Sequence, residues 1–262
     1  MVVKLFLPAV GAGRLTALGA GAVAVAVMLG SAPQARGGGS GERLTVFAAS
    51  SLTGAFRAYA PSERFTFAGS GTLQTQIENG APADVFASAS QRNTRALHAK
   101  GLVERPVVFA TNRLVLIVPR ANPAGIRTVA DLRRDGVKVV VAGDDVPAGA
   151  YAAVVLRRLR LSSALENVVS RERDVKAVAA KVALGQADAG FVYATDARAV
   201  ADRVRVIDVP ARAQPTVRYE IAVVSRSADR RAARAFIAGL LAPRGQAVLR
   251  AAGFLPPPKE QS

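Results

Sequence analysis

From residue 42 onward, short apolar runs alternate with longer segments of helical periodicity, and no other feature of the sequence constrains the fold as strongly. Such alternation favours an α/β fold, because a helix carries the chain from each strand to a parallel neighbour. We expect strands at residues 44–47, 64–68, 84–87, 114–118, 137–142, 189–193, 204–209 and 219–225. We expect helices at residues 52–59, 71–79, 91–100, 129–134, 150–160, 175–184, 231–242 and 245–252.

The length of this pattern predicts two lobes. The chain has 262 residues, which allows two lobes of roughly a hundred residues each. We therefore expect two doubly wound α/β lobes with a ligand cleft between them, joined by two crossover strands near residues 111–118 and 217–225. The first lobe would comprise residues 42–110 and 219–257, and the second lobe residues 111–218.

The first 35 residues have the layout of a secretory signal peptide. Lys4 and Arg14 precede an uncharged, largely apolar stretch at 15–30, and small residues follow up to Ala35. The stretch is short for a membrane span, so cleavage near Ala35 is the first interpretation and an uncleaved anchor is the alternative. The glycine-rich residues 36–41 would form a flexible lead-in. We expect an exported protein of the periplasm or cell-envelope exterior, associated with a membrane only through this segment.

Two residue types that often carry catalysis are rare in this chain. Cysteine is absent, which excludes disulfides, thiolate metal sites and cysteine nucleophiles. His98 is the only histidine, and its polar helical surroundings favour a surface role. Asp144 and Asp145 precede a helix, where acidic residues complement the helix dipole, and Asp84 and Asp188 are interpreted as structural. We therefore expect a binding protein rather than an enzyme, with no cofactor and no ligands for a metal cation.

The formal net charge of +16 raises nucleic acid and anionic ligands as partners. The arginines that produce this charge are spread along the chain instead of forming one cluster. Tryptophan is absent, and aromatic residues do not alternate with basic ones as they do in nucleic-acid stacking platforms. The charge is therefore interpreted as a compositional bias toward arginine, and no nucleic-acid partner is expected.

Four strand-to-helix turns carry small or hydroxyl residues, at 49–52, 69–72, 146–149 and 174–175. A helix start leaves backbone N–H groups unpaired and carries about half a positive charge, so four starts facing one point would offset about two negative charges. This arrangement suits a dianion held without lysine or arginine. Each turn alone is weak evidence, since a serine at a helix start is usually an N-cap and residues 69–71 lack the lysine of a phosphate loop.

Six short segments stand in order along the chain. The first three are VFAASSL at 46–52, FAGSGTL at 67–73 and GAPADVF at 80–86. They are followed by GDDVPAG at 143–149, RDV at 173–175 and GQADAGFVY at 185–193. Together these segments resemble the periplasmic molybdate-binding proteins of ABC importers. The resemblance covers nearly all of residues 42–256 and implies a type II periplasmic binding-protein fold. The segment 52–67 is shorter than the family pattern, which is expected to trim the first helix and second strand.

The resemblance also implies the residues that hold the ligand. Carried over position by position, the donors are the side chains of Ser51 and Ser70, the backbone amides of Ala148 and Val175, and the hydroxyl of Tyr193. The implied ligand is molybdate or tungstate, and the implied partner is the permease of an ABC transporter, with the binding protein itself a monomer. A site made only of donors favours a fully deprotonated oxyanion over a protonated phosphate, whose O–H would need an acceptor.

Three alternatives stay open at this stage. The first is a binding protein for another tetrahedral oxyanion, such as sulfate or phosphate, because cavity size is not encoded in any visible pattern. The second is the effector domain of a transcription regulator, although the N-terminus carries an export-type signal where a helix-turn-helix would stand. An enzyme is the third alternative.

Overall fold

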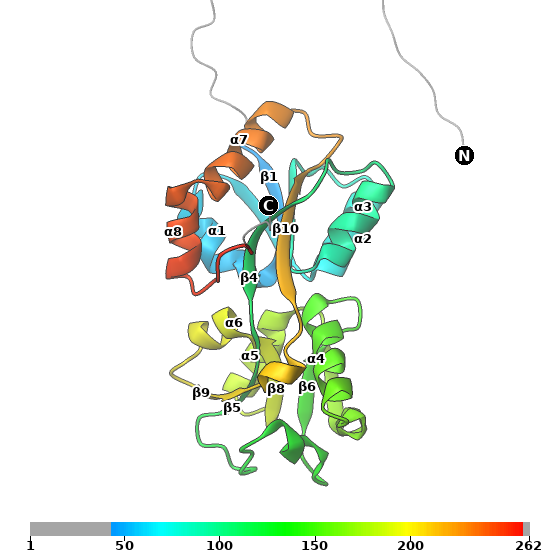
Figure 1. Ribbon diagram of the computed structural model, residues 1–262, viewed down its shortest axis with the longest axis vertical. Coiled ribbons are helices and arrows are strands. Elements are labelled where there is room, and N and C mark those ends of the chain that lie inside the picture. The colour runs from blue at the N-terminus through cyan, green and yellow to red at the C-terminus, as the bar shows by residue number, and fades with distance from the viewer. Residues whose placement is uncertain (1–42, 259–262) are drawn as a thin grey trace, which may run out of the picture. The chain divides into compact units, whose positions relative to one another are not determined.

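The computed structural model describes residues 43–258, which form two five-stranded sheets with helices packed on them (Figure 1). The predicted signal segment 1–35 and lead-in 36–41 lie outside the described residues. Between residues 43 and 258, no helix is long and apolar enough to cross a membrane.

The first sheet has the order β2-β1-β3-β10-β4. Its strands are β1 (Thr45–Ala49), β2 (Arg64–Ala68), β3 (Val85–Ser88), β4 (Val107–Asn112) and β10 (Val217–Val223). β1 pairs in parallel with β2 and β3, whereas β10 runs antiparallel to β3 and β4. The carboxyl ends of the parallel strands therefore lie on the same side of the sheet, and α/β folds bind their ligands beyond these ends.

The second sheet repeats this arrangement, in the order β7-β6-β8-β5-β9. Its strands are β5 (Leu114–Pro119), β6 (Val139–Ala142), β7 (Val168–Glu172), β8 (Ala189–Tyr193) and β9 (Val204–Asp208). β6 is parallel to β7 and β8, and β5 is antiparallel to β8 and β9. Two mixed sheets flanked by helices, one in each lobe, confirm the predicted α/β fold.

Most helices connect successive strands, as the sequence pattern predicts. The α-helices are α1 (Thr53–Tyr59), α2 (Ser70–Glu78), α3 (Gln91–Ala99), α4 (Pro147–Arg158), α5 (Val175–Ala183), α6 (Ala194–Ala199), α7 (Arg230–Leu241) and α8 (Pro243–Ala251). The 3-10 helices are η1 (Ser50–Leu52), η2 (Val129–Arg133), η3 (Ser162–Asn167) and η4 (Ala211–Ala213). α4 begins at Pro147, earlier than predicted. Proline is tolerated in the first turn of a helix because the backbone N–H that it lacks would have no partner there.

The chain passes from the first sheet to the second at Arg113, between β4 and β5. Thr111 and Asn112, assigned above to the second lobe, pair in the first sheet with Arg218 and Val217 of β10. The chain therefore leaves the first lobe slightly after the predicted boundary at residue 111, and it returns slightly before the predicted boundary at residue 219. Figure 1 shows β4 and β10 side by side where they leave the first lobe.

Close packing fixes β8 and α5 against each other in the second lobe. β8 is buried along its whole length, and Gly190, its second residue, lies against α5 and β6. A Cβ on Gly190 would lie 2.7 Å from Val178 Cγ1 and 3.0 Å from the Val140 carbonyl oxygen. Only glycine allows α5 to pack this closely on β8, and that packing sets the start of α5 beside the end of β8.

Candidate anion-binding site

Ser51 and Ser70 both follow the carboxyl ends of parallel strands of the first sheet. Ser51 lies in η1, which directly follows β1. Ser70 is the first residue of α2, and only Gly69 separates it from the end of β2. Neither serine is the N-cap of its helix, because the cap positions of η1 and α2 are Ala49 and Gly69. The ordinary interpretation of a serine at a helix start, that it caps the helix, therefore does not describe this structure.

Both serine hydroxyls hydrogen-bond to partners outside their own helices. Ser51 Oγ lies 2.9 Å from the hydroxyl of Tyr219, which belongs to β10. Ser70 is buried, and its Oγ accepts a hydrogen bond of 3.1 Å from the backbone N–H of Ala89. An oxygen that accepts from a fixed donor keeps its own hydrogen for another acceptor. The contacts thus hold the Ser70 hydroxyl as a donor.

Ala148 and Val175 lie in the first turns of α4 and α5, where backbone N–H groups have no partner within the helix. Both residues are buried. α5 is capped by Asp174, whose side chain accepts from the N–H of Ala177, whereas Val146 at the cap of α4 has no such side chain. The two helix starts therefore supply N–H groups and positive dipole ends without adding a formal positive charge.

Tyr193 ends β8 and is 1% exposed. Its hydroxyl is buried and makes no hydrogen bond to any residue between 43 and 258. Burial raises the pKa of this phenol well above its ordinary value, and the nearby Tyr219, Tyr151 and Asp196 raise it further, so the group stays a neutral donor. A buried hydroxyl without a partner costs free energy, which indicates that something else accepts its hydrogen bond.

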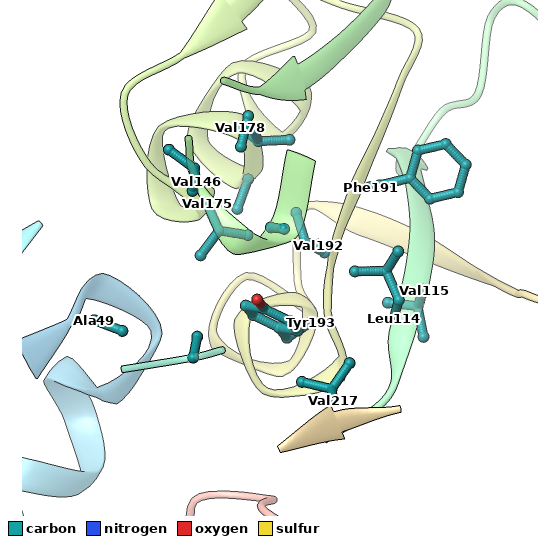
Figure 2. Close-up of a cluster of buried hydrophobic side chains, with 14 of the residues drawn as sticks. Ala49, Leu114, Val115, Val146, Val175, Val178, Phe191, Val192, Tyr193 and Val217 are labelled. Atoms are coloured by element: carbon teal, nitrogen blue, oxygen red, sulfur yellow. The ribbon is translucent and has the colours of Figure 1, made fainter. Parts of the chain in front are cut away.

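Contacts between the lobes bring these residues toward one place. The Tyr193 ring lies 5.7 Å from the ring of Tyr219, whose hydroxyl contacts Ser51. A Cβ on Gly69 would lie 2.7 Å from the carbonyl oxygen of Arg173, two residues before Val175. Figure 2 draws Tyr193, Ala49 at the end of β1 and Val175 at the start of α5 as members of one cluster of buried side chains.

The structure therefore places all five predicted residues at element ends near the contact between the lobes. Tyr219 contacts both Ser51, by a hydrogen bond, and Tyr193, by ring packing. The backbone at the start of α2 lies close to the segments that precede α4 and α5. Direct contact of the five with an anion stays a prediction.

Two buried residues at this place were not found from the sequence. Tyr219 lies on the return strand, and its role depends on a contact with a residue 168 positions earlier. Asp196 lies in α6 and is buried, and its Oδ2 has no hydrogen-bond partner among the described residues. Burial raises the pKa of Asp196 to about 7, although Lys176 and the backbone of Tyr193 act in the opposite direction. The only feature of the sequence that could have pointed to Asp196 is its position three residues after the predicted site residue Tyr193.

Three of the acidic residues discussed above, Asp84, Asp144 and Asp188, have structural partners. Asp144 pairs with Arg171 at 3.0 Å in an exposed ion pair, and no group of three or more potential metal ligands occurs within the described part of the chain. Asp84 accepts from the N–H of Thr45 and Asp188 from the N–H of Lys138, so both fix strand starts.

Two α/β lobes, each a mixed sheet flanked by helices, with strand ends and helix starts meeting where the lobes touch, have the architecture of a two-lobed solute-binding protein. The chain belongs to the family described as bacterial extracellular solute-binding protein, whose model matches residues 44–255. The family binds solutes and does not transform them, in agreement with the expectation that the chain is not an enzyme.

Individual relatives support this assignment. The molybdate-binding protein ModA of Mycobacterium tuberculosis (strain H37Rv) is 40% identical over 225 residues, which cover 82% of this chain and 85% of the relative. The substrate-binding domain of a putative molybdenum ABC transporter from Clostridium difficile has 32% identity and a TM-score of 0.59, covering 82% of this chain and 99% of that chain. The fold is also similar to the periplasmic molybdate-binding protein of Azotobacter vinelandii, with a TM-score of 0.74 at 24% identity over 82% of this chain and 100% of that one.

Proposed function

We propose that this protein binds molybdate, and also tungstate, and delivers it to the permease of an ABC importer. The proposed ligand contacts are the hydroxyls of Ser51, Ser70 and Tyr193 and the amides of Ala148 and Val175. The protein would act outside the cytoplasm as a monomer, exported by its N-terminal segment, and would need no cofactor. The names and identities of the relatives support the choice of molybdate.

One observation carries the proposal: the buried hydroxyl of Tyr193 has no partner among the described residues. A neutral donor in a buried site can bind an anion that only accepts hydrogen bonds, and molybdate is such an anion at neutral pH. The same donor set disfavours hydrogen phosphate, since its O–H would lack an acceptor, at a cost of about 1–3 kcal/mol. Sulfate also accepts only, so its exclusion would depend on the size of the closed site.

The test is calorimetric titration of the purified protein with molybdate, tungstate, sulfate and phosphate. We expect molybdate and tungstate to bind more tightly than hydrogen phosphate by about 10-fold or more. Because the donors are uncharged, the molybdate dissociation constant should change less than about threefold between low and moderate salt. Tightest binding to phosphate or sulfate, or a steep loss of affinity with salt, would replace this proposal with another oxyanion or a site of basic residues.

Tyr193→Phe separates binding from stability. We expect it to weaken molybdate binding about 10-fold or more, because one donor to a charged ligand is lost. The same change should leave the ligand-free protein equally or more stable, because it removes a buried hydroxyl that has no partner. Tyr59→Phe is the matched control: the Tyr59 hydroxyl donates to the Phe236 carbonyl at 2.8 Å, so its loss should lower stability and leave binding unchanged. Equal binding by wild type and Tyr193→Phe would remove Tyr193 from the site.

A further inference from the structure

Tyr219 connects the site to the strand that crosses between the lobes. Its side chain is fully buried, and its ring packs edge-on against Phe109 at 6.1 Å, Phe254 at 5.2 Å and Tyr193 at 5.7 Å. Its hydroxyl lies 2.9 Å from Ser51 Oγ, and either oxygen could donate in that pair. The direction of this hydrogen bond decides whether Ser51 can donate to a ligand.

The surroundings of Tyr219 favour one direction. The backbone N–H of Arg113 donates to Asn112 Oδ1 at 2.9 Å, which orients the Asn112 amide so that its Nδ2 becomes the donor toward the lobe interior. Asn112 Nδ2 donates to Thr195 Oγ1 at 3.0 Å, and the Asn112 side chain lies close enough to the Tyr219 hydroxyl to lower its pKa. Burial raises the pKa of Tyr219 well above its ordinary value, and the opposing effects of Ser51 and Asn112 are smaller, so the hydroxyl stays protonated. Because the Asn112 amide presents a donor to the phenol oxygen, we take the Tyr219 hydrogen to be the one donated to Ser51.

We infer that Tyr219 is a positioning residue that holds the Ser51 hydroxyl as a hydrogen-bond donor toward the bound anion. Donation from Tyr219 occupies a lone pair of Ser51 Oγ and turns the serine hydrogen away from Tyr219. The Ala89 N–H does the same to Ser70. Each serine thus receives one hydrogen bond and has one to give. This inference rests on the proposed function, because it takes Ser51 to contact the anion.

The consequence is specificity as well as affinity. With Tyr219 donating to its oxygen, Ser51 presents its hydrogen to the ligand, so a ligand O–H at that position would meet a donor instead of an acceptor. Tyr219 would therefore favour anions that only accept, such as molybdate, over hydrogen phosphate. Without the phenol, the Ser51 hydroxyl could rotate and use its free lone pair to accept from the O–H of hydrogen phosphate.

The test is a double-mutant cycle with Ser51→Ala and Tyr219→Phe, read by calorimetric titration with molybdate. Phenylalanine keeps the ring packing of Tyr219, and thermal unfolding of each variant checks that the fold is retained. We expect Ser51→Ala to weaken binding about 10- to 100-fold. Tyr219→Phe should weaken it about 5- to 10-fold in the wild type but less than about twofold in the Ser51→Ala background, since Tyr219 acts through Ser51. In parallel, Tyr219→Phe should reduce the preference for molybdate over hydrogen phosphate.

Tyr59→Phe, which removes a hydroxyl outside the site, should leave molybdate affinity unchanged in either background. Equal losses from Tyr219→Phe in both backgrounds, or no loss in either, would overturn the inference, as would an equal loss of affinity for both anions. If the wild type binds molybdate but Ser51→Ala binds equally well, the inference fails while molybdate binding stands. If the wild type binds none of the oxyanions, the proposed function fails and this inference fails with it.

Discussion

At the scale of single residues, the site is notable for the buried groups that stay neutral. Tyr193 and Tyr219 are phenols whose pKa values burial raises, and Asp196 is a carboxyl that burial makes harder to ionise. A dianion can be bound in such surroundings only if the nearest groups donate hydrogen bonds without carrying negative charge. Below neutral pH, the protonated form of Asp196 meets that condition.

Asp196 should also make stability depend on pH. Its pKa is about 7 in the folded protein and near the ordinary aspartate value of 3.8 in the unfolded chain, so between these pH values only the folded state keeps the proton. Stability contributed by this group is present below about pH 4 and is lost as pH rises to about 7, by about 4 kcal/mol at most. Asparagine cannot ionise, so the stability of Asp196→Asn should not show this decrease between pH 4 and pH 7.

Urea unfolding of wild type and Asp196→Asn from pH 4 to pH 8 measures the effect. The difference between the two proteins isolates Asp196 from carboxyls such as Glu104 and Glu172, whose pKa values are lowered by their basic partners. Parallel stability curves across this pH range would show that Asp196 ionises in the folded protein as readily as in water.

At the scale of elements, the turn from β2 into α2 is shaped by close approach to the other lobe. A Cβ on Gly71 would lie 2.4 Å from the carbonyl oxygen of Asp145, which precedes α4. Glycine at this position lets the start of α2 approach the start of α4 backbone to backbone. The glycines flanking Ser70 therefore serve closure of the lobes and are not part of a phosphate loop.

Gly71→Ala should hold the lobes apart without disturbing either one. We expect molybdate affinity to fall about 10-fold or more, because a misplacement of about 1 Å breaks hydrogen bonds to the ligand. Thermal unfolding without ligand should change little. Gly54→Ala is the control, because a Cβ there meets nothing within 4 Å. Unchanged affinity in Gly71→Ala, measured by titration, would mean that this contact is not needed for binding.

The sequence predicted elements best where apolar runs are continuous. β8, buried at every position, and α5, ended by Gly185, appear where expected. β4 and β7 were missed; both contain exposed and half-buried positions, and β7 ends in the charged residues Arg171 and Glu172. The short helix α6 was missed as well, and with it the position of Asp196. Local patterns show which residues start helices but not which side chains meet across the chain, as Ser51 and Tyr219 do.

At the scale of the molecule, the two lobes divide the proposed donors between them. Ser51 and Ser70 come from the first lobe, whereas Ala148, Val175 and Tyr193 come from the second. One anion bound by both sets would hold the lobes closed, since opening would break hydrogen bonds on one side. Binding should therefore stabilise the closed arrangement through neutral donors, despite the +16 net charge of the whole chain.

The most direct test of this account is a crystal structure of the protein grown with molybdate, with molybdenum located by its anomalous scattering. The account predicts one strong peak between the lobes, with ligand oxygens about 2.7–3.2 Å from the hydroxyls of Ser51, Ser70 and Tyr193 and the amides of Ala148 and Val175. A peak elsewhere, or one held by lysine or arginine side chains while those five groups point away, would contradict it.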